Sequence, residues 1–112
     1  MDLETRRMEF GKHRGETFRT VAEQDTDYCK WALRLPHPSG QMEEFTVFLR
    51  RLFGGVLTFG KYADWFFTEV LGDDPSYGEW ALGQPRPSAR LAEFVGFVRE
   101  QQQQKQQKQQ KQ

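Results

Sequence analysis

The stretch Phe10-Gly11-Lys12 decides how this chain is organised, because it returns as Phe59-Gly60-Lys61 together with the sequence around it. When the sequence is shifted by 49 positions, residues 10–51 align with residues 59–100 without a gap and share 17 identities in 42 positions. Shared composition does not supply so many identities in one register, so the sequence predicts a tandem repeat. Besides the opening three, the identical pairs are Phe18/Phe67, Val21/Val70, Asp25/Asp74, Tyr28/Tyr77, Trp31-Ala32-Leu33/Trp80-Ala81-Leu82, Pro36/Pro85, Pro38/Pro87, Ser39/Ser88, Glu44/Glu93, Phe45/Phe94, Phe48/Phe97 and Arg50/Arg99.

The repeat divides the chain into a lead-in (1–7), repeat 1 (8–53), repeat 2 (54–100) and a glutamine and lysine tail (101–112). The chain has 112 residues, of which 37% are apolar, so it can hold one modest domain. A copy of about fifty residues would be marginal alone, so we expect the two copies to share one core. The tail has no apolar stripe, and we expect a helical extension or a disordered segment there.

The charge balance argues against a strongly basic surface. Formal net charge is zero, but the tail holds three lysines and no acid, which leaves 13 basic and 16 acidic side chains elsewhere. A protein that neutralises duplex DNA broadly would show the opposite balance, although a local basic patch is compatible with it. Cys29 is the single cysteine and excludes an internal disulfide, and no apolar run is long enough for a membrane span. We therefore expect a soluble intracellular protein that contacts no membrane.

Each copy is expected to begin with a short strand, because Met8-Glu9-Phe10 and Leu57-Thr58-Phe59 alternate apolar and polar residues. We expect the two strands to pair antiparallel across a pseudo-twofold axis, since neither is stable alone. Two short helices and a longer one follow in each copy, with Thr17, Asp25 and Asp74 as capping residues. The predicted fold class is therefore α+β.

A local basic cluster in repeat 1 is the clearest polar feature. It consists of Lys12, His13, Arg14 and Arg19. A lysine after a turn glycine places a cation near exposed backbone amides, an arrangement that can hold phosphate, and Lys61 has the same setting in repeat 2. The alternative is a lysine paired with Asp25 or Asp74, which contributes at most ~1 kcal/mol when exposed.

The aromatic pairs Tyr28 with Trp31 and Tyr77 with Trp80 have two readings. Exposed rings of this kind stack nucleic-acid bases, whereas aromatic stripes on helices usually pack in the core. We expect the tryptophans to be core residues and keep Tyr28 as a candidate stacking residue.

No catalytic constellation is found. His13 and His37 are the only histidines, and neither belongs to a metal-binding or nucleophile-activating pattern. Cys29 aligns with Gly78, which favours a small packed side chain over a reactive thiol. We therefore expect a protein without enzymatic activity, without a metal and without a cofactor.

Both copies resemble the module found at the C-terminus of exodeoxyribonuclease-X-like and polymerase-epsilon-like proofreading proteins. The usual form is Phe-Gly-Lys-Tyr/His-Lys-Gly, then Asp-Pro-Ser-Tyr and a Trp. Repeat 1 matches it at Phe10, Gly11, Lys12, Gly15, Asp25, Tyr28 and Trp31. Repeat 2 matches it at Phe59, Gly60, Lys61, Asp74, Pro75, Ser76, Tyr77 and Trp80, and departs from it at Asp64. The resemblance covers about 25 residues of each copy and implies an accessory module associated with nucleic acid. The sequence is consistent with a monomer or with part of a larger assembly.

Two functions are consistent with the sequence. The first is a binding module that contacts single-stranded nucleic acid through Lys12, His13, Arg14 and Arg19, with Tyr28 stacking and Lys61 as a further anion-binding residue. The second is a protein-interaction or assembly subunit that uses its helical surface.

Overall fold

The structure is a computed structural model that describes the backbone of residues 3–110 and the side chains of residues 3–104. The chain divides into two compact units, Met1–Val56 and Leu57–Gln112, and each is described here by itself. The expectation of a core shared between the copies stays a prediction.

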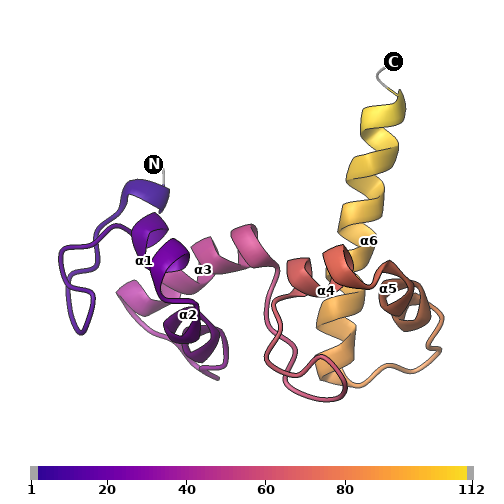
Figure 1. The fold of residues 1–112 in the computed structure, drawn as a ribbon, viewed down its shortest axis with the longest axis horizontal. Coiled ribbons are helices and arrows are strands. Elements are labelled where there is room, and N and C mark those ends of the chain that lie inside the picture. The colour runs from indigo at the N-terminus through magenta and orange to yellow at the C-terminus, as the bar shows by residue number, and fades with distance from the viewer. Residues whose placement is uncertain (1–2, 111–112) are drawn as a thin grey trace. The chain divides into compact units, whose positions relative to one another are not determined.

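The first unit is a cluster of helices (Figure 1). It contains a 3-10 turn η1 (Leu3–Thr5) and the helices α1 (Phe18–Gln24), α2 (Thr26–Leu33) and α3 (Gln41–Phe53). Thr17 caps α1 and Asp25 caps α2 through their side chains, as predicted. The core is built on Phe18 of α1, whose ring packs edge-on against Phe45 of α3 at 5.1 Å between centroids.

The second unit repeats this arrangement with α4 (Phe67–Asp73), α5 (Pro75–Leu82) and α6 (Ala89–Gln110). Phe67 packs edge-on against Phe94 at 5.1 Å, which is the same contact shifted by 49 residues. Asp74 again precedes the second helix, and Pro75 occupies its first turn. The side chain of Asp74 makes no capping hydrogen bond, unlike that of Asp25, so this part of the prediction is wrong. Helix α6 continues through the glutamine and lysine run to Gln110, so most of the tail backbone is helical.

The prediction of an α+β fold is wrong. Residues 3–110 form six α-helices and no strand, and the expected antiparallel pairing between the copies does not occur. The reason is that each segment finds its backbone partners inside its own copy. Met8 N–H donates to Glu16 O at 2.8 Å, and Gly15 N–H donates to Met8 O at 2.8 Å. In the second unit, Leu57 makes the same two hydrogen bonds with Trp65 and Asp64.

The lead-in forms part of the first unit. An isolated antiparallel bridge joins Arg7 to Thr17, and Phe18 N–H donates to Arg6 O at 2.8 Å. The guanidinium of Arg6 lies 3.1 Å from a carboxylate oxygen of Glu44 on α3. The described residues include no helix long and apolar enough to cross a membrane.

The expectation that the tryptophans are core residues is also wrong, because Trp31 is 49% exposed and Trp80 is 50% exposed. The buried residues of α2 are Cys29, Ala32 and Leu33. On a helix with 100° per residue, Trp31 lies on the side opposite to these three, and Tyr28 lies at their edge. The buried face is therefore displaced by about one position from the predicted one.

Gly11 and Gly60, the glycines of the repeated motif, have left-handed backbone conformations, which residues other than glycine adopt only with strain. Gly60 has φ +77°, and a Cβ there would meet only the Tyr77 hydroxyl, at 3.9 Å. Gly60→Ala should therefore lower the free energy of unfolding of the second unit by about 1–2 kcal/mol through backbone strain alone. Urea unfolding measures this.

Gly96→Ala is the matched control in the same unit. Gly96 lies within α6 with open space around it, so alanine should raise the stability there by up to about 1 kcal/mol. Equal effects of the two substitutions would contradict the assigned role of Gly60.

Candidate functional site

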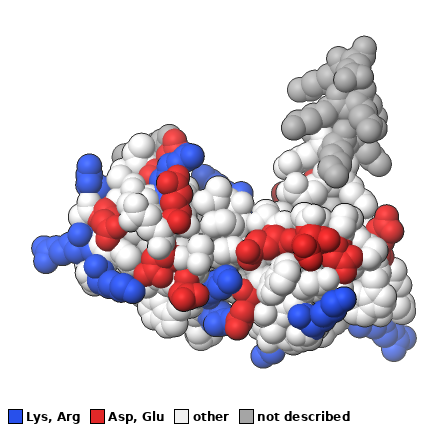
Figure 2. All heavy atoms as spheres, in the orientation of Figure 1, with Lys and Arg blue, Asp and Glu red and all other residues white. Residues whose placement is uncertain are grey.

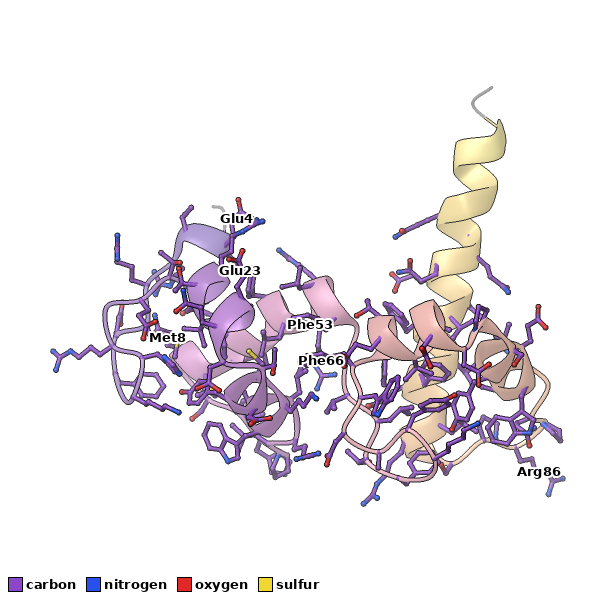
Figure 3. The ribbon with its side chains drawn as sticks, in the orientation of Figure 1. Glu4, Met8, Glu23, Phe53, Phe66 and Arg86 are labelled. Atoms are coloured by element: carbon purple, nitrogen blue, oxygen red, sulfur yellow. The ribbon has the colours of Figure 1, made fainter. Side chains whose placement is uncertain are left out.

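The repeated motif forms a closed loop, residues 8–17, ahead of α1. Gly11 and Gly15 have φ +76° and +89°, values that few other residues adopt. Met8 is almost fully buried at the base of this loop (Figure 3). The second unit closes the equivalent loop with Gly60 and with Asp64, a non-glycine residue at φ +73°.

The carboxylate of Asp25 joins this loop to α2. Oδ2 lies 2.9 Å from Lys12 Nζ and 2.9 Å from His13 Nε2, while Oδ1 accepts the N–H of Tyr28 at 3.1 Å. The hydrogen bond from Lys12, with those from Tyr28 N–H and His13, lowers the pKa of Asp25 to about 2. Lys12 has 69% of its side chain exposed, so its ammonium can contact a partner while it is paired.

His13 is buried and uses both ring nitrogens. Nδ1 lies 2.7 Å from Glu16 and Nε2 lies 2.9 Å from Asp25, so each nitrogen faces a carboxylate oxygen. A neutral imidazole donates from one nitrogen only, and therefore this geometry requires the imidazolium. Burial lowers the pKa of His13, but the hydrogen bonds with Glu16 and Asp25 outweigh it, and the net shift is upward.

A row of rings leads from this network to the surface. His13 contacts Tyr28 edge-on at 4.8 Å between centroids, and Tyr28 contacts Trp31 at 5.4 Å. Tyr28 also rests against Phe45 of the core at 6.0 Å. The half-buried Tyr28 is thus a support, and Trp31 is the ring that offers an open face.

The second unit rebuilds the network with different chemistry. Tyr62 replaces His13, and its hydroxyl donates to Asp74 Oδ2 at 2.6 Å. That hydrogen bond, together with burial, raises the pKa of Tyr62 to about 12. Lys12 pairs with Asp25, whereas the Nζ of Lys61 lies over the Tyr62 ring, 5.3 Å from its centre, in the range of a cation–π contact.

The structure does not gather the four predicted basic residues of repeat 1 at one point. Lys12 and His13 meet at Asp25, and Arg14 is exposed in the same turn. Arg19 instead points along α1, where it pairs with Glu4 at 2.9 Å and Glu23 at 2.8 Å. Figure 3 shows Glu4 and Glu23 on the same side of the first unit.

Two functional candidates were missed by reasoning from sequence. Trp31 was assigned to the core, although the helical position of Cys29 relative to it is a signal for exposure. Arg7 belongs to the predicted lead-in, but it is exposed and donates to Gly15 O at 2.7 Å, which places it beside the loop. Figure 2 shows lysine and arginine side chains projecting around the loop of the first unit.

Other chemistry finds little support in the described residues. Burial raises the pKa of the Cys29 thiol to about 12, and its Sγ lies 3.8 Å from Val21 O. A thiol of this kind is not an activated nucleophile at neutral pH. Within residues 3–104, no group of three or more histidine, cysteine or acidic side chains is placed to hold a metal ion.

Comparison with protein families finds a match over part of the first unit. Residues 8–34 match the family model described as Exodeoxyribonuclease X-like C-terminal. The match covers the loop, α1 and α2 of the first unit, which hold Lys12, His13, Asp25, Tyr28 and Trp31. Neither the comparison with curated proteins nor that with solved structures finds a match to this chain.

The paired carboxylates around His13 make the stability of the first unit depend on pH. Because the pKa of His13 is raised above its ordinary 6.5, its stabilisation is complete below about 6.5 and is lost as pH rises through the folded value. The lowered pKa of Asp25 has the opposite consequence, since its contribution is lost as pH falls from 3.8 towards about 2. Urea unfolding followed by NMR signals of α1 and α2 should therefore show maximal stability between about pH 4 and 6.5.

His13→Tyr, which installs the residue of the second unit, should remove the loss on the alkaline side. His37→Gln leaves the Asp25 network intact and should keep that loss. If His13→Tyr and the unchanged protein share one pH profile, the imidazolium assignment is refuted.

Proposed function

We propose that the chain is a non-catalytic accessory module built from two copies of one unit, and that the first copy binds single-stranded nucleic acid. Trp31 stacks on an exposed base, and Lys12 and Arg14 contact the neighbouring phosphates. The observation that carries the proposal is the row of rings that starts beside Lys12 and ends at the half-exposed Trp31.

The tandem arrangement is supported by contacts that recur at a shift of 49 residues. The Tyr77–Trp80 distance is 5.2 Å where Tyr28–Trp31 is 5.4 Å, with similar tilts of 39° and 43°. The four-residue loop turn is closed by Arg14 N–H to Gly11 O in one unit and by Ala63 N–H to Gly60 O in the other, each at 3.2 Å. Copies that keep such detail are best explained as one duplicated module.

Stacking suits the exposed side of Trp31. A tryptophan that is already supported by Tyr28 loses little side-chain freedom when a base packs on its open face. Each stacked base contributes roughly 1–3 kcal/mol, and stacking tolerates any base because every base has a π face. The site therefore fits unpaired bases, whose faces are free, better than a duplex.

The charges suit a short contact with phosphate. Residues 1–56 hold nine basic and nine acidic side chains, so attraction is local and arises at Arg7, Lys12 and Arg14 around the loop. Two or three such contacts predict a slope of roughly −2 for the logarithm of the association constant against the logarithm of salt concentration. The name of the matching family connects this kind of module with an exodeoxyribonuclease, which agrees with an accessory role on nucleic acid.

Fluorescence anisotropy with labelled single-stranded and duplex oligonucleotides at two salt concentrations tests the proposal. Trp31→Ala should weaken single-strand binding roughly 5- to 150-fold, which corresponds to one lost stacking contact. Lys12→Glu should weaken binding and reduce the salt dependence.

Trp80→Ala is the matched control, because Trp80 has the same exposure and the same tyrosine support. In the second unit, however, Ala63 stands where Arg14 stands in the first, so the loss should be much smaller. Absence of binding at low salt, or binding that does not respond to Trp31→Ala, would reject the proposal.

A further inference from the structure

The second unit carries a longer row of aromatic rings than the first. Trp65 contacts Tyr62 at 4.9 Å, Tyr62 contacts Tyr77 at 4.9 Å, and Tyr77 contacts Trp80 at 5.2 Å. Trp65 and Trp80, the two ends of the row, are 36% and 50% exposed. The two tyrosines in the middle hold both tryptophans in place, so the surface presents two supported indole faces.

The second unit carries more acidic than basic side chains. Residues 57–100 hold four basic and seven acidic side chains, a net charge of −3. Asp64 and Glu79, both exposed, directly precede the two tryptophans in sequence, and Asp74 accepts the hydroxyl of Tyr62. Figure 2 shows acidic side chains gathered in a band over the part of the chain that contains α4 and α5. A phosphate backbone is disfavoured on such a surface, and a cation is attracted to it.

A cation already lies on the row. The ammonium of Lys61 lies 5.3 Å from the centre of the Tyr62 ring, within the range of a cation–π contact. In the first unit the equivalent lysine, Lys12, forms an ion pair with Asp25, and the ring equivalent to Tyr62 is the imidazolium of His13. In the first unit a ring of the row itself, His13, carries positive charge, whereas the rings of the second unit's row are uncharged phenols and indoles, and the ammonium of Lys61 lies over one of them.

We propose that the aromatic row of the second unit binds a basic segment of a protein partner, with arginine or lysine side chains stacked on Trp80 and Trp65. Arginine suits the site best, because its planar guanidinium stacks on an indole and donates hydrogen bonds to a carboxylate at the same time. The proposal does not depend on nucleic-acid binding by the first unit.

The three tryptophans of the chain allow a direct test, since each gives one indole N–H signal in a ¹H–¹⁵N NMR spectrum. The probe is the blocked peptide Ac-Arg-Gly-Arg-Gly-Arg-NH₂, with Ac-Gln-Gly-Gln-Gly-Gln-NH₂ as its neutral counterpart. The arginine peptide should shift the signals of Trp65 and Trp80 and leave that of Trp31 in place. A single-stranded oligonucleotide should do the reverse, so the failure of one proposal is distinguishable from the failure of the other.

Trp80→Ala should weaken binding of the arginine peptide roughly three- to thirtyfold, as expected for one cation–π contact. Trp31→Ala is the matched control and should not change it. Equal shifts with the glutamine peptide, or shifts at Trp31 alone, would overturn the proposal. Shifts that appear without peptide as the protein is concentrated would also overturn it, because they would assign the row to a second copy of the chain.

Discussion

Each unit depends on one carboxylate that fastens the glycine loop to the start of the second helix. In the first unit Asp25 accepts the N–H of Tyr28 and also receives His13 and Lys12, so loop and helix share one anion. In the second unit Asp74 precedes α5 and receives the hydroxyl of Tyr62. Histidine and tyrosine both occur at this position, and each carries a polar hydrogen on its ring that bonds to the aspartate. The motif therefore has a structural role: its contacts with the aspartate stabilise a small unit that has only a small core.

This constraint changes which residues are candidates for binding. A side chain already held by the closing network, such as His13, is unavailable to a partner unless the loop opens. The available groups are those that the network supports from beneath, above all Trp31 and Trp80. Residues that are identical in the two copies therefore mainly indicate the fold. Residues that are exposed, or that differ between the copies, are the better candidates for binding.

The caps of α1 and α2 are predictable from sequence because capping is local: Thr17 and Asp25 accept backbone N–H groups only three residues further along. Two features are not. Short alternating segments such as Met8-Glu9-Phe10 need partners for their backbone groups, and sequence does not reveal whether these lie in the other copy or, as here, in the loop itself. The sequence pattern also predicts the wrong buried face for α2. Its eight residues make barely two turns, so a shift of the buried face by one residue buries Cys29 and exposes Trp31.

The two units keep one arrangement of helices although their loops carry different side chains. Positions 14 and 16 of the first unit hold arginine and glutamate, whereas the aligned positions 63 and 65 hold alanine and tryptophan. Glu16 and Trp65 accept the closing hydrogen bonds from Met8 and Leu57 through their backbone carbonyls, so these side chains can differ without loss of the bonds that close the loop. Replacing the His13 imidazolium by the Tyr62 phenol makes this ring of the row uncharged and keeps the hydrogen bond to the aspartate that precedes the second helix. The proposed binding of an anionic partner by the first unit and of a cationic partner by the second is compatible with one fold, because the tyrosine that supports the indole and the aspartate that closes the loop occur in both units.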